Sequence, residues 1–154
     1  KLQKALQISD ISVYTYGSTI AAKKASDLKN RVKFVNETDN ALLLSIHQNF
    51  FTQSQYSGTQ VFYSANREES AALAQKIQEK VRTNLQPDNT REIKKSGDSI
   101  YLLYNAKQIA VMVECGFLSN RTEEYNLRNG DYQKKICCII ASALSMYINN
   151  ASVA

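Results

Sequence analysis

Hydrophobic residues along the chain follow two spacings, which predict strands alternating with helices. Short β-branched, aromatic or continuously apolar segments predict strands at 11–16, 41–47, 60–64, 100–104 and 109–115. Apolar residues three or four positions apart predict helices over 18–37, 66–85 and 131–149. Because helices follow strands through most of the chain, we expect an α/β fold, a three-layer sandwich with a mainly parallel or mixed central sheet flanked by helices.

Details of the pattern refine three of these elements. The runs at 41–47 and 109–115 are almost continuously apolar, which is typical of strands covered on both faces. Asn66 followed by Glu69 resembles a capping box that opens the second helix. Residues 1–7 resemble the end of an amphipathic helix without a preceding cap. We therefore expect residues 1–154 to form one domain that is incomplete at its N-terminus.

Composition narrows the choice of partner. The chain has 154 residues, of which 44% are hydrophobic, and a net charge of +5 with a pI near 9.1. A basic surface favours polyanionic surroundings such as nucleic acid, an anionic membrane or an acidic bacterial wall. The basic residues are scattered and aromatic residues do not interleave with them, so we expect no nucleic-acid partner. No apolar run reaches the length of a membrane span, so we expect no stable membrane insertion of this chain.

Three cysteines, Cys115, Cys137 and Cys138, form neither an even set nor a CxxC pair. That pattern argues against a disulfide framework and against a cysteine metal site. We expect all three to pack inside the protein as small apolar residues.

Two residues stand out as candidates for chemistry. His47, the only histidine, ends the apolar run at 41–47, and ligands gather at such strand ends in open α/β sheets. Glu114 lies within the apolar segment VMVECGF, where a charge is costly unless it is paired or binds a metal. On position alone, His47 is either a structural histidine or a ligand, and Glu114 is either an edge-strand surface residue or a site residue.

A family resemblance bears on this choice. The segment from Asp27 to Asn49, ending in SIHQN, resembles one block of the zinc-dependent N-acetylmuramoyl-L-alanine amidases, and VECGFLSNRTEEYNL resembles their ExGFxSNxxE block. Between them, SGTQVFYS, REIK and YLL follow in the family's order, and the first and last of these segments resemble the single-domain spore-cortex type. The resemblance covers the chain from about Arg31 to Tyr147.

The resemblance implies an activity and roles for several residues. The reaction is hydrolysis of the amide bond between N-acetylmuramic acid and L-alanine in bacterial peptidoglycan. His47 is implied as a ligand of Zn²⁺ and Glu114 as the general base that accepts a proton from the attacking water. Arg91 and Asn49 are implied near the substrate, although a solvated arginine in a polar loop is an equal alternative for Arg91. Gly116 either lets the backbone approach the substrate or marks a bulge, and Asn120 and Glu124 cap and orient the next helix.

The chain departs from the family pattern at its N-terminus. The family takes its other two zinc ligands, a histidine and a glutamate, from a GHGG-type turn and the following helix, and neither is present here. Two hypotheses stay open: part of a zinc amidase whose other ligands lie upstream, or a catalytically inactive peptidoglycan-binding or scaffold protein of the same fold.

The resemblance also suggests surroundings and partners. We expect a protein exported to the cell wall or spore envelope, with peptidoglycan as its substrate and a protein regulator as a further partner. If a strand is missing, unpaired backbone groups at a sheet edge favour a homodimer or aggregation.

Overall fold

A computed structural model describes residues 21–151 of the chain. In chain order the elements are α2 (Ala21–Asn36), β1 (Leu42–Asn49), β2 (Gln60–Tyr63), α3 (Glu69–Asn84), β3 (Lys94–Lys95), α4 (Tyr101–Asn105), β4 (Ile109–Phe117), α5 (Arg121–Arg128) and α6 (Gly130–Ala151). The strand expected at 11–16 and the helix end expected at 1–7 lie outside the described residues.

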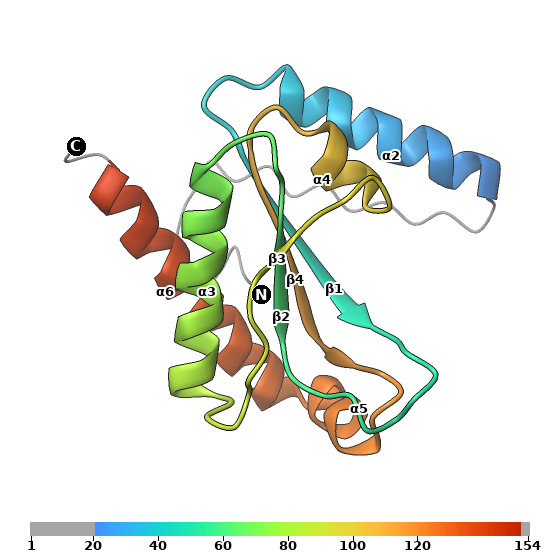
Figure 1. The fold of residues 1–154 in the computed structure, drawn as a ribbon, viewed down its shortest axis with the longest axis vertical. Helices are drawn as coiled ribbons and strands as arrows, with labels where there is room; N and C mark the ends of the chain where they lie inside the picture. The colour runs from blue at the N-terminus through green and yellow to red at the C-terminus, as the bar shows by residue number, and fades with distance from the viewer. Residues whose placement is uncertain (1–20, 152–154) are drawn as a thin grey trace.

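The four strands form one mixed sheet with the order β1-β4-β2-β3 (Figure 1). β1 is parallel to β4, β2 is antiparallel to β4, and β3 is parallel to β2. The sheet confirms the expected α/β fold with a mixed central sheet.

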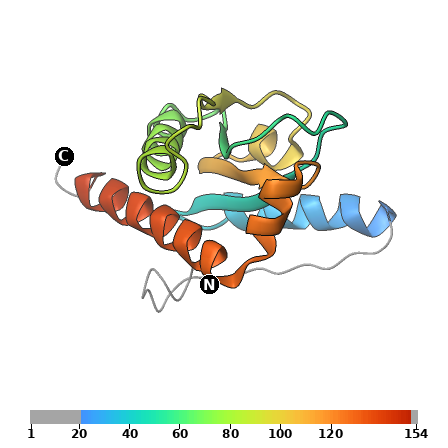
Figure 2. The ribbon, with the colours of Figure 1, turned by 90° about the horizontal axis from the view of Figure 1, so that it is seen from below.

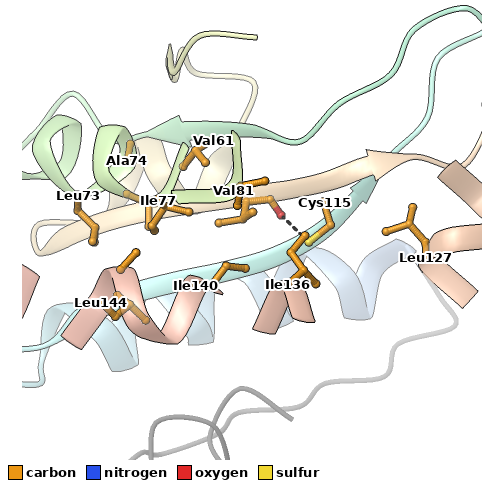
Figure 3. Close-up of a cluster of buried hydrophobic side chains, with 13 residues drawn as sticks. Val61, Leu73, Ala74, Ile77, Val81, Cys115, Leu127, Ile136, Ile140 and Leu144 are labelled. Atoms are coloured by element: carbon orange, nitrogen blue, oxygen red, sulfur yellow. Dashed lines mark hydrogen bonds between the residues drawn. The ribbon is translucent and has the colours of Figure 1, made fainter. Parts of the chain in front are cut away.

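Side chains alternate across β4 and divide the core into two layers. Val111, Val113 and Cys115 point to the face covered by α3 and α6, where they join a cluster of 13 buried apolar residues that includes Ile77 and Ile140 (Figure 3). The other face carries a smaller cluster, formed by Leu103, Ala106, Ala110 and Met112. Figure 2 shows α3 and α6 on one side of the sheet and α2 and α4 on the other, which makes three layers.

The helix α4 covers only part of the sheet face on which it lies. It contacts α2 and β4, and its neighbours in the small cluster include Leu43 of β1 and Phe62 of β2. These residues pair with the first half of β4, since Leu43 is the register partner of Ala110 and Phe62 that of Met112. The next row along the same face, at Glu114, therefore lies beyond the small cluster under α4.

The strand prediction at 100–104 is wrong, because this segment is the helix α4. Leu102 and Leu103 are both buried while Tyr101 and Tyr104 are exposed, a pattern that a helix produces and a strand does not. Short apolar runs do not distinguish the two structures without this tertiary information.

Two finer predictions also fail. Asn66 does not cap α3, because its side-chain amide donates to the carbonyls of Tyr104 and Ala106, and the helix begins after Glu68 without a side-chain cap. β1 is only half-buried rather than covered on both faces, because it lies at the edge of the sheet formed by the described residues. β4, in contrast, is a buried central strand as predicted.

The cysteines differ in their surroundings. Cys115 is buried as expected, but Cys137 is half-buried and Cys138 is exposed on α6. Burial, together with Cys137 and Glu114 nearby, raises the pKa of the Cys115 thiol to about 12. That thiol is therefore protonated and unreactive at neutral pH.

Candidate active site

A polar row crosses three strands next to the small core cluster. His47 of β1 is the register partner of Glu114 of β4, and Glu114 is in turn the partner of Gln60 of β2. Register partners on adjacent strands point to the same face of a sheet, with Cβ atoms about 4.5–5.5 Å apart in antiparallel pairs. The fold thus aligns the imidazole of His47, the carboxylate of Glu114 and the amide of Gln60. His47 and Glu114 are 67 residues apart in sequence (114 − 47).

The row lies where two parallel strands end. β1 and β4 run in the same direction, and both stop within three residues of His47 and Glu114. The register shifts just beyond the row, because two steps from His47 to Asn49 correspond to three steps from Glu114 to Phe117. Gly116 lies in this bulge with a φ of +155°, which a residue with a side chain rarely adopts. Of the two interpretations of Gly116, the structure shows the bulge.

Glu114 is held in an unusual electrostatic environment. Its Oε2 atom is buried and has no hydrogen-bond partner among the residues that the structure describes. Burial raises the pKa of the Glu114 carboxyl above its ordinary value of 4.5. A partly desolvated carboxylate without donors is a stronger proton acceptor than a solvated one, which suits a general base. His47, beside it, is solvent-exposed.

The described residues do not make a complete zinc site. A catalytic zinc takes three protein ligands and keeps one open position. Between residues 21 and 151, no three His, Cys, Asp or Glu side chains are grouped to hold a metal ion. His47 is also the only histidine among the 154 residues. The donors present, one imidazole beside one carboxylate with an unbonded oxygen, fit part of such a site.

Arg91 lies next to the row through Gln60. Its Nη1 donates to Gln60 Oε1 at 3.1 Å, and its Nε donates to the carbonyl of Ser57 at 2.6 Å. The guanidinium also lies over the Phe117 ring, with Cζ 4.5 Å from the ring centroid. Arg91 is therefore a half-buried cation held by Ser57, Gln60 and Phe117 rather than a fully solvated arginine.

Asn49 shapes the end of β1. Its Oδ1 accepts from the backbone N–H of Phe50 at 2.8 Å, and its carbonyl accepts from Leu118 N at 2.8 Å. The bond from Leu118 ties the end of β1 to the loop after β4, one register pair beyond the row.

Glu123 joins the two loops and was not among the residues singled out from the sequence. Its carboxylate accepts from Gly58 N at 2.8 Å and from Phe117 N at 2.7 Å, and a Cβ at Gly116 would lie 3.2 Å from it. Asn120 caps α5 as predicted, by accepting from Thr122 N and Glu123 N. The orienting role expected of Glu124 is wrong, because that side chain pairs with Arg128 on the surface. The final glutamate of the ExGFxSNxxE block falls on Glu123, which is the signal that could have identified it.

In the part of the chain that the structure describes, no helix is long and apolar enough to cross a membrane.

Known proteins match this chain over most of its length. The family described as N-acetylmuramoyl-L-alanine amidase matches residues 1–146. A germination-specific N-acetylmuramoyl-L-alanine amidase of Bacillus subtilis (strain 168) is 36% identical over 125 residues, which cover 81% of this chain and 52% of that protein. The chain thus spans about half the length of this relative.

Solved structures agree with this match. The CwlD amidase from Clostridioides difficile, solved in complex with the GerS lipoprotein, has a TM-score of 0.83 and 33% identity, covering 96% of this chain and 81% of that one. The catalytic domain of CwlV, an N-acetylmuramoyl-L-alanine amidase from Bacillus (Paenibacillus) polymyxa var. colistinus, has a TM-score of 0.74 and 25% identity, covering 96% and 79%. This chain belongs to the N-acetylmuramoyl-L-alanine amidase family.

Proposed function

We propose that the protein containing this chain hydrolyses the amide bond between N-acetylmuramic acid and L-alanine in bacterial peptidoglycan, with Glu114 as general base and His47 as a zinc ligand. The observation that carries the proposal is the pairing of His47 and Glu114 at the ends of two parallel strands, with a buried carboxylate oxygen that has no partner. Membership of the amidase family gives the bond to be cut.

Glu114 performs the proton transfers in this proposal. Its carboxylate accepts a proton from a water molecule as the water attacks the carbonyl carbon of the muramoyl amide. The C–N bond then breaks, and Glu114 returns the proton to the nitrogen of L-alanine, which leaves as a free amine. The raised pKa of Glu114 favours the first step, since the carboxylate binds the proton more readily than a solvated one.

His47 supplies one of three zinc ligands in this proposal, and the other two come from outside residues 21–151. A bound zinc ion polarises a carbonyl and makes water more acidic. In this proposal, residues 1–154 are part of one catalytic domain. Arg91 and Asn49 bind the substrate next to the row. Two positions support this role: Arg91 is hydrogen-bonded to Gln60, and Asn49 is the register partner of Phe117.

The experiment that tests the proposal is digestion of purified peptidoglycan with the full-length protein. We expect new N-terminal L-alanine and no new reducing ends on the glycan strands, because only the amide bond is cut. Release of reducing sugars, or no new alanine N-terminus at saturating zinc, would contradict it.

A second function is favoured by one observation, the lack of a three-ligand group within the described residues. It is a catalytically inactive peptidoglycan-binding or scaffold protein that keeps the fold. Sequencing the intact gene separates the two: a GHGG turn followed by a ligand glutamate upstream supports the enzyme, and their absence supports the scaffold.

Partners and location follow from the relatives. The CwlD amidase was solved with a lipoprotein, and a B. subtilis relative is specific to germination. We extend both to this protein: it acts outside the cytoplasmic membrane, at the cell wall or spore envelope, and a second protein regulates it. Copurification with a tagged copy from sporulating cells tests the regulator.

A further inference from the structure

The guanidinium of Arg91 is fixed in place before any substrate binds. Its Nε donates to Ser57 O at 2.6 Å and its Nη1 to Gln60 Oε1 at 3.1 Å, while its backbone N–H donates to Asn89 Oδ1 at 3.0 Å. These three bonds connect the residue to Ser57 near the end of the loop between β1 and β2, to the first residue of β2, and to Asn89 in the loop after α3. A cation held in this way loses little conformational entropy when it binds a ligand.

Two aromatic rings also contact the Arg91 guanidinium. Arg91 Cζ lies 4.5 Å from the centroid of the Phe117 ring and 5.8 Å from that of Tyr56. The two rings are themselves in contact, with centroids 6.3 Å apart. Stacking of a planar guanidinium on an aromatic face leaves its in-plane N–H groups free to bind a ligand.

The charge of Arg91 has no carboxylate partner among residues 21–151. Its Nη2 donates to no described acceptor, and no carboxylate lies within ion-pair distance. Arg67, Arg82 and Arg128, in contrast, each contact a glutamate. A half-buried arginine that is fixed but not neutralised is suited to bind an anion, and a carboxylate matches its planar donors best.

We propose that Arg91 binds a free carboxylate of the peptidoglycan stem peptide, on a residue beyond the L-alanine whose amide is cut. The inference rests on the proposed function for the position of the scissile bond. Gln60 is hydrogen-bonded to Arg91 and is the register partner of Glu114, so a single side chain separates the guanidinium from the general base. Consecutive Cα atoms in a peptide are about 3.8 Å apart, so a carboxylate one residue beyond L-alanine reaches the neighbouring side chain.

The test measures binding of two synthetic peptides, N-acetylmuramoyl-L-alanyl-D-glutamate and its α-carboxamide, by calorimetry. The protein is the full-length, zinc-loaded Glu114→Gln variant, which leaves the peptides uncut. We expect the carboxylate peptide to bind at least about tenfold more tightly than the carboxamide peptide, which is the contribution of a charge-assisted hydrogen bond. Adding Arg91→Gln should remove this preference, whereas Arg128→Gln, which changes an exposed arginine of α5, should keep it.

Equal Kd values for the two peptides, or a preference that survives Arg91→Gln, would overturn the inference. Because Arg91 also holds two loops, thermal unfolding checks that the Arg91→Gln variant is folded. If it is not, Arg91→Lys takes its place. The single ammonium of Lys lacks the planar donor pair, so the preference for the carboxylate peptide should also fall in Arg91→Lys. An unchanged preference in that variant overturns the inference. Hydrolysis by the wild-type protein is measured separately: failure to cut either peptide contradicts the proposed function, while the Kd ratio still decides the role of Arg91.

Discussion

At the scale of single residues, the central feature is a buried carboxylate oxygen, Glu114 Oε2, to which no residue between 21 and 151 donates a hydrogen bond. Gln60, the register partner of Glu114, could have donated to it, but the Gln60 amide is already engaged, with Oε1 accepting from Arg91 and Nε2 donating to the Glu92 carbonyl. Both polar atoms of the Gln60 amide thus bond to Arg91 and Glu92 rather than to Glu114. A carboxylate with satisfied oxygens would have a lower pKa and accept protons less readily.

The raised pKa of Glu114 predicts how stability changes with pH. A carboxyl whose pKa is higher in the folded state binds more protons when folded, so its contribution to stability is present at low pH and is lost as the pH rises through the folded pKa. Glu114→Gln should therefore be more stable than wild type at neutral pH, and the difference should shrink as the pH falls toward 4.5, the ordinary value.

Urea unfolding of the metal-free protein at both pH values measures this difference. Glu124→Gln, which removes a carboxylate from a surface ion pair, is the matched control. A Glu114→Gln variant that is less stable than wild type at neutral pH would show that the charged carboxylate is stabilised by partners in the fold.

Sequence reasoning at this scale found the residues but not their surroundings. A charge within an apolar strand and a histidine at a strand end are visible in sequence, and both lie in the polar row. The part played by Gln60 is not visible, because it depends on which residue of β2 lies opposite Glu114. Nothing local in QVFY marks that register.

At the scale of elements, two loops and the start of α5 depend on one carboxylate. Glu123 accepts from Gly58 N in the loop after β1 and from Phe117 N at the end of β4. The bulge at Gly116 brings that end of β4 against the Glu123 side chain. Because Ser57 of the same loop holds Arg91, Glu123 acts on the site through the position of this loop.

Removal of Glu123 should loosen both loops. Glu123→Ala leaves the Gly58 and Phe117 amides without their acceptor, and an unsatisfied buried donor costs about 1–3 kcal/mol of unfolding free energy. Glu124→Ala removes the neighbouring carboxylate, whose exposed pair with Arg128 is worth about 0.3–0.5 kcal/mol. Chemical unfolding of both variants gives the comparison, and equal losses would mean that Glu123 does not hold the loops together.

Most helices and strands followed from hydrophobic spacing, and the failures have a common cause. The long helices α3 and α6 and the buried strand β4 have enough residues to define a period. The segment YLLYN is five residues long, too short for a spacing, and became a helix because Leu102 and Leu103 could both be buried against the sheet. β3 has two residues and no pattern at all.

At the scale of the whole molecule, the mixed sheet brings the ends of β1 and β4 together and places the start of β2 beside them. The expectation of a mixed sheet flanked by helices came from the alternation of elements, whereas the order β1-β4-β2-β3 did not follow from it. Strand order depends on which apolar faces pair after collapse, and both 41–47 and 109–115 had the composition of a central strand.

The metal requirement makes a prediction about the 154-residue chain by itself. One imidazole gives neither the number nor the geometry of ligands that zinc requires, so this chain should bind zinc weakly or not at all. Calorimetric titration with zinc measures the affinity. Tight binding of one zinc per chain would mean that the ligands are other residues than those proposed.

The central claim assigns proton transfer to Glu114 and metal binding to His47, and one paired measurement on the full-length protein separates the two. Zinc content and the rate of release of L-alanine-terminated peptides from peptidoglycan are measured for Glu114→Gln and His47→Ala. We predict that Glu114→Gln keeps its zinc while its rate falls by roughly 10² to 10⁴, as for a lost general base, and that His47→Ala loses zinc and activity together. A Glu114→Gln variant with near wild-type turnover, or a His47→Ala variant that keeps its full zinc content, would contradict these assignments.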